Sequence, residues 1–205
     1  MKVELVISPS CNFPSIAHMA YLCNAEKVKI ETNENYQKRS CRNRYGIVDH
    51  YGTKTLSIPL KKGKNEQLPI SKVQISHDEN WQIQHLRTIK TAYGKAPYFE
   101  YYFDHLSDLF HKNHPTLLEF NNDCLNFFYK HAQMQINLEF TSAYLRNYEN
   151  GLDLRTKIPI LDTLPYYAQV FEDRLQFIPN ASVLDLLFCC GPAAGSYLRS
   201  IKIMK

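Results

Sequence analysis

The sequence predicts an α/β fold that starts with a βαβ unit and continues as a mainly parallel, Rossmann-like sheet with an inserted β-hairpin and several packed helices. The run from Val3 to Ile7 is rich in β-branched residues and ends at Ser8-Pro9, which indicates a buried strand. Apolar residues at helical spacing follow between Ile16 and Cys23, and Lys27 to Ile30 reads as a second strand. This order of elements favours a right-handed crossover between parallel strands.

The next segment predicts the inserted hairpin. Tyr45 to His50 and Lys54 to Pro59 are strand-like and flank Tyr51-Gly52-Thr53, a sequence suited to a tight turn. Lys61 to Glu66 has no apolar anchor, so we expect a mobile loop there. Ile70 to Ile75 is then interpreted as a further strand.

The middle of the chain is predicted to be helical. Asp78 is placed to cap a helix that Gly94 ends, and Pro97 suits the first turn of the next helix. Leu117 to Met134 has helical spacing, and Ile136 to Phe140 alternates like a strand.

The last third of the chain combines an irregular segment with one short helix. Residues 143–165 are polar and without periodicity, and are predicted to form an irregular loop. A helix is expected to begin at Asn180 or Ser182 and to stop at Gly191-Pro192. We therefore expect residues 1–205 to form a single domain.

Composition narrows the class of protein. With 44% apolar and 21% charged residues the chain resembles an ordinary soluble globular protein, and a net charge of +4 with no RNA or DNA motif argues against nucleic-acid binding. No run approaches the length of a membrane span. The six cysteines lack C-x-x-C spacing, so we expect reduced thiols in a cytoplasmic protein. His111-x-x-His114 precedes Pro115 and lacks a third donor, so no metal site is predicted, and no cofactor is identified.

The segment from Tyr36 to Arg44 is the centre of the functional prediction. It holds four cations, and guanidinium groups present planar donor forks that match phosphate or carboxylate. On an extended chain Lys38, Arg42 and Arg44 would share one face, with Arg39 pointing away. A solvated turn between two strands is the alternative. The residues expected to bind an anionic small molecule, such as a nucleotide sugar or sugar phosphate, are Lys38, Arg39, Arg42, Asn43 and Arg44.

Further candidates lie elsewhere in the chain. Asn12 follows the first strand, where ligands bind in open α/β sheets, although it also suits a helix cap. His85 and Arg87 could extend the anion site or serve structure alone. Asp185 stands in an apolar run, so we expect it to meet backbone N–H groups or a cation, with Arg42, Arg44 or His85 as the partner. A structural clamp and a catalytic carboxylate both fit that pairing.

Four blocks of the sequence form a recognisable pattern: Pro9-x-x-x-Phe13-Pro14, Tyr36-Gln37-Lys38-Arg39-Ser40-x-Arg42-Asn43-Arg44, Trp81-x-x-x-His85-Leu86-Arg87-Thr88-Ile89-x-x-x-Tyr93-x-Lys95-Ala96-Pro97-Tyr98-Phe99-Glu100, and Tyr167-x-Gln169 with Phe177-x-Pro179-x-x-Ser182-x-Leu184-Asp185-Leu186-Leu187-Phe188. In these blocks the chain resembles the WbqC-like proteins of bacterial polysaccharide gene clusters. Lys95 and Gln169 join the candidate binding residues on this ground.

The resemblance implies a role in O-antigen and other surface-polysaccharide biosynthesis. It suggests a transferase that modifies a nucleotide-linked or phosphorylated sugar, with aminoacyl (glycine) transfer as the reaction, and His85 and Asp185 are the candidates for moving a proton. The family tends to carry an acidic pair after the second strand, where this chain has Thr32 and Asn33 between Glu31 and Glu34. That difference favours the alternative, a non-catalytic accessory protein that binds the same anionic ligand.

Overall fold

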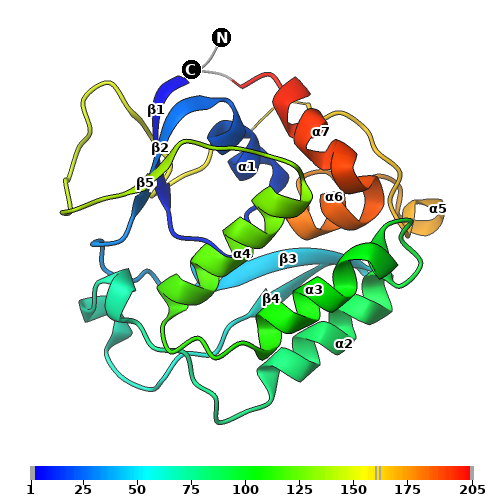
Figure 1. The fold of residues 1–205 in the computed structure, drawn as a ribbon, viewed down its shortest axis with the longest axis horizontal. Helices are drawn as coiled ribbons and strands as arrows, with labels where there is room; N and C mark the ends of the chain where they lie inside the picture. The colour runs from blue at the N-terminus through cyan, green and yellow to red at the C-terminus, as the bar shows by residue number, and fades with distance from the viewer. Residues whose placement is uncertain (1–2, 160, 162, 204–205) are drawn as a thin grey trace.

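The computed structural model describes residues 3–159, 161 and 163–203, and it confirms the α/β class. A four-stranded parallel sheet has the order β5-β2-β1-β6 (Figure 1). Its strands are β1 (Val3–Pro9), β2 (Ala25–Glu31), β5 (Leu138–Phe140) and β6 (Leu152–Asp153). Helix α1 (Ile16–Cys23) makes the predicted crossover between β1 and β2.

The βαβ unit is held by apolar burial and by one helix cap. Val6, Ile7, Val28 and Ile30 of the two central strands are fully buried, as expected for parallel strands covered on both faces. Ser15 caps α1, because its hydroxyl accepts a hydrogen bond from the backbone N–H of His18. The helix of the crossover therefore begins at Ile16, as the sequence predicts.

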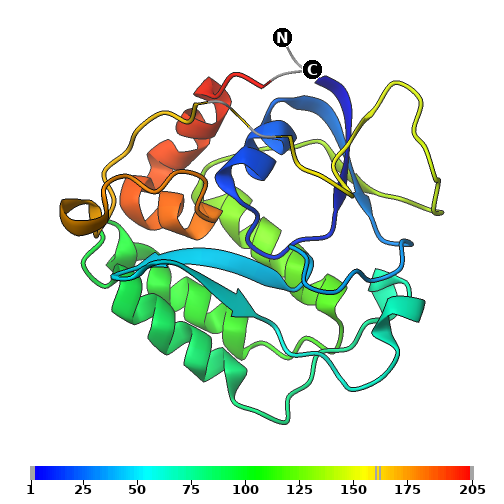
Figure 2. The same cartoon turned by 180° about the vertical axis from the view of Figure 1, so that it is seen from behind.

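The predicted hairpin is confirmed as β3 (Arg44–Asp49) and β4 (Gly52–Ser57), which pair antiparallel outside the parallel sheet. The hairpin crosses the molecule (Figures 1 and 2). The parallel sheet and α1 lie on one side of it, and the helical layer of α2 and α3 lies on the other. Strand β3 contacts α2 (Trp81–Tyr93) and α6 (Val183–Cys190). The remaining helical elements are α3 (Phe99–His111), α4 (Leu117–His131), α5 (Glu172–Leu175), α7 (Ala194–Ser200) and the 3-10 turns η1 (Asn65–Gln67), η2 (Ile70–Lys72) and η3 (Gly191–Ala193).

The longest helix is α4, with 15 residues. A helix that crosses a bilayer needs about 20 mainly apolar residues. Within the described residues no helix combines the length and the apolar character that a membrane crossing requires.

Three local predictions are wrong. Ile70 to Ile75 is not a strand, because η2 occupies its first half, and Gln74 and Ile75 form only isolated bridges, with Thr116 and Leu60 respectively. Asp78 does not cap α2; its carboxylate accepts a hydrogen bond from the Ser76 hydroxyl instead. Residues 143–165 are not entirely irregular, because they contain β6 at the edge of the parallel sheet.

Candidate functional site

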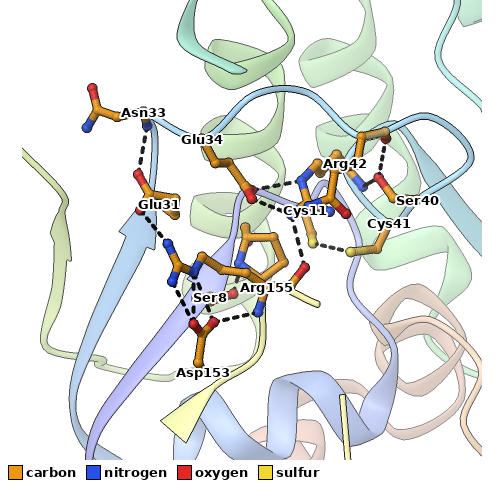
Figure 3. A network of polar contacts seen from close by, with 12 residues as sticks. Ser8, Cys11, Glu31, Asn33, Glu34, Ser40, Cys41, Arg42, Asp153 and Arg155 are labelled. Carbon is orange, nitrogen blue, oxygen red and sulfur yellow. Dashed lines mark hydrogen bonds and ion pairs between the residues drawn. The ribbon is translucent and has the colours of Figure 1, made fainter. Parts of the chain in front are cut away.

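Polar side chains converge at the carboxyl edge of the parallel sheet. Glu31 ends β2, Thr141 follows β5, and Asp153 and Arg155 come from β6 and the residues after it. Because parallel strands end at the same edge, segments more than 100 residues apart in sequence meet here. Figure 3 shows the side chains of Glu31, Asp153 and Arg155 pointing toward one another.

Glu31 is a fully buried carboxylate whose two oxygens are both used. One oxygen accepts hydrogen bonds from the backbone N–H of Asn33 (2.8 Å) and from the Thr141 hydroxyl (2.7 Å), and the other accepts from Nη1 of Arg155 (3.1 Å). Asp153 accepts from Nη2 of the same guanidinium at 2.6 Å. A buried charge is tolerated when it is paired and hydrogen-bonded, and Glu31 meets both conditions.

Arg155 also orders the segment before β6. Its guanidinium donates to the carbonyl oxygens of Leu145 and Arg146 and lies 5.1 Å from the ring centroids of both Tyr144 and Tyr148. Arg155 thereby holds residues 144–148, which form no helix or strand, against the end of β2.

The second buried pair joins Glu34 to Arg42. Nε and Nη2 of Arg42 donate to the two carboxylate oxygens of Glu34 at 2.7 and 2.6 Å, a bidentate geometry, and Nη2 also donates to the carbonyl of Arg155 at 3.1 Å. Arg42 is 1% and Glu34 4% exposed. Burial raises the pKa of the Glu34 carboxyl, and the hydrogen bonds from Arg42 oppose that rise.

A surface pocket of about 480 Å³ borders this pair. Its volume lies within the range of small-molecule sites. Two acidic residues, Glu34 and Glu66, line the pocket, and Tyr144, 53% exposed, presents an aromatic ring. The complete lining is Asn33, Glu34, Asn35, Tyr36, Gln37, Glu66 and Tyr144. Carboxylates, amides and tyrosine rings together suit the hydroxyl groups and apolar face of a sugar.

The segment from Tyr36 to Arg44, called the basic stretch below, was predicted to be extended. This prediction is wrong, because residues 38–43 form turns. Arg39 adopts φ 54° at the tip, and the Ser40 hydroxyl donates to the carbonyl of Gln37 at 2.6 Å. The chain therefore reverses and sends Arg42 inward, where Glu34 neutralises it. Asn43 is also buried, accepting from the Tyr36 hydroxyl and donating to the carbonyl of Ile58.

The other cations of the stretch are more accessible. Lys38 is exposed and pairs with Glu66 of the pocket wall, and Arg39 is exposed. Arg44 is half-buried, and among the described residues its Nε has no hydrogen-bond partner. Lys38 and Arg39 are therefore placed to donate to an anionic group, whereas Arg42 and Asn43 are committed within the protein and the unpartnered Nε of Arg44 is buried.

Among the described residues, the Asp185 side chain contacts neither a cation nor a backbone N–H group, contrary to the sequence prediction. Its Oδ2 accepts hydrogen bonds from the Tyr167 hydroxyl (2.5 Å) and from Nε2 of Gln169 (2.8 Å), and Tyr93 also contacts this carboxyl. Burial raises its pKa, which these hydrogen bonds partly offset. Asp185 and Gln169 thus belong to one buried cluster, and their contacts are internal.

The remaining candidates do not join the carboxyl-edge network. His85 lies in an aromatic environment, with Nδ1 2.9 Å from the Tyr45 hydroxyl, and burial lowers its pKa to about 4. Arg87 and Lys95 are exposed on α2 and just after it. Asn12 is buried in the loop after β1, where its Oδ1 accepts from the backbone N–H of Phe13.

A cluster that the sequence did not predict lies beside Arg42. The sulfur atoms of Cys11 and Cys41 are 3.0 Å apart, and Nδ1 of His18 is 3.9 Å from Cys11 Sγ (Figure 3 labels both thiols). Burial, with a smaller contribution from Arg42, lowers the pKa of His18 to about 4, so its ring is neutral at pH 7. Spacing did not reveal this group, because its members are 7 and 23 residues apart along the chain.

The fold and these contacts define an α/β protein with a buried ion network at the carboxyl edge of a parallel sheet. The chain belongs to the WbqC-like protein family, whose model matches residues 10–160. The match begins in the loop after β1, and it covers the basic stretch and the hairpin. No curated protein and no solved structure matches the chain.

Proposed function

We propose that the protein is a transferase-type enzyme that modifies a nucleotide-linked or phosphorylated sugar during surface-polysaccharide biosynthesis. The observation that carries this proposal is the pocket at the carboxyl edge, with Glu34 among its lining residues. The tyrosine rings and amides of the pocket take the sugar, and Lys38 and Arg39 in the adjoining turn meet the phosphate. Family membership supports the pathway.

Glu34 is the proton acceptor in this proposal. When a sugar hydroxyl attacks an acyl carbon, a carbon–oxygen bond forms, the donor's leaving group departs with its electron pair, and the hydroxyl proton passes to a base. Glu34 lines the pocket, Arg42 fixes its orientation, and burial raises its pKa toward the range useful for a base. Aminoacyl transfer to a sugar is the reaction that this arrangement suits.

One observation favours the alternative of an accessory protein that binds the sugar without converting it. Both oxygens of Glu34 already accept hydrogen bonds from Arg42, and both oxygens of Glu31 are likewise occupied. Such complete pairing is also what a purely structural network needs. Binding and turnover must therefore be measured separately.

The binding test is calorimetric titration with nucleotide sugars, the matching nucleotides and the free sugars. Tyr144→Ala removes the exposed ring of the pocket and should weaken binding of a sugar-bearing ligand about tenfold, or 1.4 kcal/mol. Tyr101→Ala is the matched control, since Tyr101 is 73% exposed on α3 and is not part of the pocket lining. Equal affinities for the two variants would place the ligand elsewhere.

Turnover separates the two functions. With glycine or its activated forms as donor, Glu34→Gln should lose product formation by at least the hundredfold that proton transfer contributes. Because this change also breaks the buried pair with Arg42, Trp81 fluorescence must first show that the variant is folded. Wild-type protein that binds a nucleotide sugar and forms no product with any donor supports the accessory function. Glu34→Gln with full activity would remove Glu34 from the reaction.

A further inference from the structure

Two thiols and one imidazole meet beside the ion network at a point that the proposed transfer reaction does not use. Cys11 lies in the loop after β1, His18 on α1, and Cys41 in the turn before β3. One potential ligand atom from each side chain lies within 4.8 Å of the others. We propose that Cys11, His18 and Cys41 form a binding site for a soft divalent cation, with Zn²⁺ as the best match to the donor set.

The hydrogen bonds of His18 leave the correct nitrogen free for a metal. The Ser8 hydroxyl donates its proton to the carbonyl of Pro9 (2.9 Å), so in its 2.8 Å contact with Nε2 of His18 the hydroxyl oxygen is the acceptor. Nε2 therefore carries the ring proton, and Nδ1 of the neutral ring presents a lone pair toward Cys11. A ligating histidine whose other nitrogen donates to an oxygen is the usual arrangement in metal sites.

The distances fit a tetrahedral ion after small movements. Zinc bonds of about 2.3 Å to sulfur and about 2.0 Å to nitrogen place two sulfur ligands about 3.8 Å apart and a sulfur and a nitrogen about 3.5 Å apart. The observed Cys11–Cys41 separation is 3.0 Å and the Cys11–His18 separation is 3.9 Å. These two separations need to change by less than about 1 Å, and the third, between Cys41 and His18, lies within 4.8 Å, so side-chain rotation can bring the donors to one ion.

Charge and coordination number agree with this assignment. Two thiolates neutralise one Zn²⁺, so the ion can enter a buried site without an added counter-charge. Arg42 is close to both thiols, but the bidentate contact with Glu34 balances its positive charge. Three protein donors leave the fourth tetrahedral position to water or a small ligand.

The first experiment measures Zn²⁺ affinity of the reduced full-length protein by competition with a chromophoric chelator. Wild-type protein should bind one equivalent, and Cys41→Ser should weaken binding at least tenfold. Cys190→Ser is the matched control, because it also removes one half-buried thiol but lies at the end of α6, and it should bind as wild type does. Wild-type protein without stoichiometric binding, or two variants of equal affinity, would overturn the proposal.

A second measurement identifies the ligands independently of affinity. Co²⁺ bound by thiolates gives a sulfur-to-metal charge-transfer band in the near ultraviolet, and Cys11→Ser or Cys41→Ser should reduce it. Ser8→Ala keeps all three donors but removes the acceptor that orients His18, so it should weaken binding 10- to 100-fold. Unchanged Co²⁺ spectra in both cysteine variants would show that the metal binds elsewhere. Fluorescence of the buried Trp81 confirms that each variant is folded.

Discussion

Replacing Arg42 with alanine should lower the free energy of unfolding by about 3–5 kcal/mol, the usual cost of breaking a buried ion pair from one side. Arg42 is 1% exposed and donates hydrogen bonds of 2.7 and 2.6 Å to Glu34 and of 3.1 Å to the carbonyl of Arg155. The alanine variant leaves the Glu34 carboxylate buried without its partner. Since small proteins are stable by about 5–15 kcal/mol, this loss is large enough to threaten folding.

Urea unfolding monitored by the fluorescence of Trp81, the one tryptophan of the chain, measures this loss. Arg42→Met combined with Glu34→Gln removes both charges, so the double variant should lose less stability than the sum of the two single variants. A loss below about 1 kcal/mol in Arg42→Ala would match a surface ion pair and refute the role of burial.

The pH dependence of the stability of Arg42→Ala tests the same prediction in a second way. Without Arg42, burial remains the largest influence on Glu34, with smaller opposing effects of Glu31 and Arg155, and it holds the folded-state pKa above the unfolded value of about 4.3. A raised carboxyl pKa costs stability as pH rises through that window, and the cost disappears below it. Arg42→Ala should therefore lose less stability near pH 4 than near pH 7. An equal loss at both pH values would indicate that packing, and not charge, dominates.

Two further substitutions test other buried features. Burial raises the pKa of Asp185, so its carboxyl binds a proton more readily in the folded state, and its ionisation lowers stability as pH rises above about 3.9. Asp185→Asn should therefore raise the urea midpoint relative to wild type at pH 7 and leave little difference at pH 3.5. A larger gain at pH 3.5 than at pH 7 would contradict a raised pKa. Gly191 has φ 57°, and an added Cβ would lie 2.5 Å from the ring of Tyr98. Gly191→Ala should therefore cost at least about 1–2 kcal/mol in the same assay, and a smaller loss would mean that the ring moves aside.

The fold was largely predictable because its early elements carry local signals. The strand from Val3, the helix from Ile16 and the hairpin around Gly52 each combine periodicity with a clear stop, and all three are confirmed. Strand β6 was missed because its residues, Leu152 and Asp153, gain their conformation from pairing with β1 and not from local preference. The failure at Ile70 to Ile75 has a similar cause, since Ile70, Val73 and Ile75 are all buried although the segment begins with a 3-10 turn and forms no strand.

The candidate site was predicted only in part because its contacts depend on where distant charges fold. A run of cations indicates an anion site only if the protein leaves those cations unpaired, and the sequence contains no local sign that Arg42 turns inward to Glu34. Arg155 was not predicted at all, although it ties Glu31 to Asp153. Its segment has no motif, and only the closing of β6 onto β1 brings it to the edge.

The burial of Arg42 limits what a binding experiment on the basic stretch can show. An Arg42→Ala variant that loses ligand affinity would be ambiguous, because loss of the pair with Glu34 also destabilises the fold. Lys38 and Arg39 are exposed, and substitutions there are expected to change stability by less than about 0.5 kcal/mol. Loss of affinity for the phosphate-bearing ligand in Lys38→Ala or Arg39→Ala, with the free sugar unaffected, therefore reports the anion contact itself.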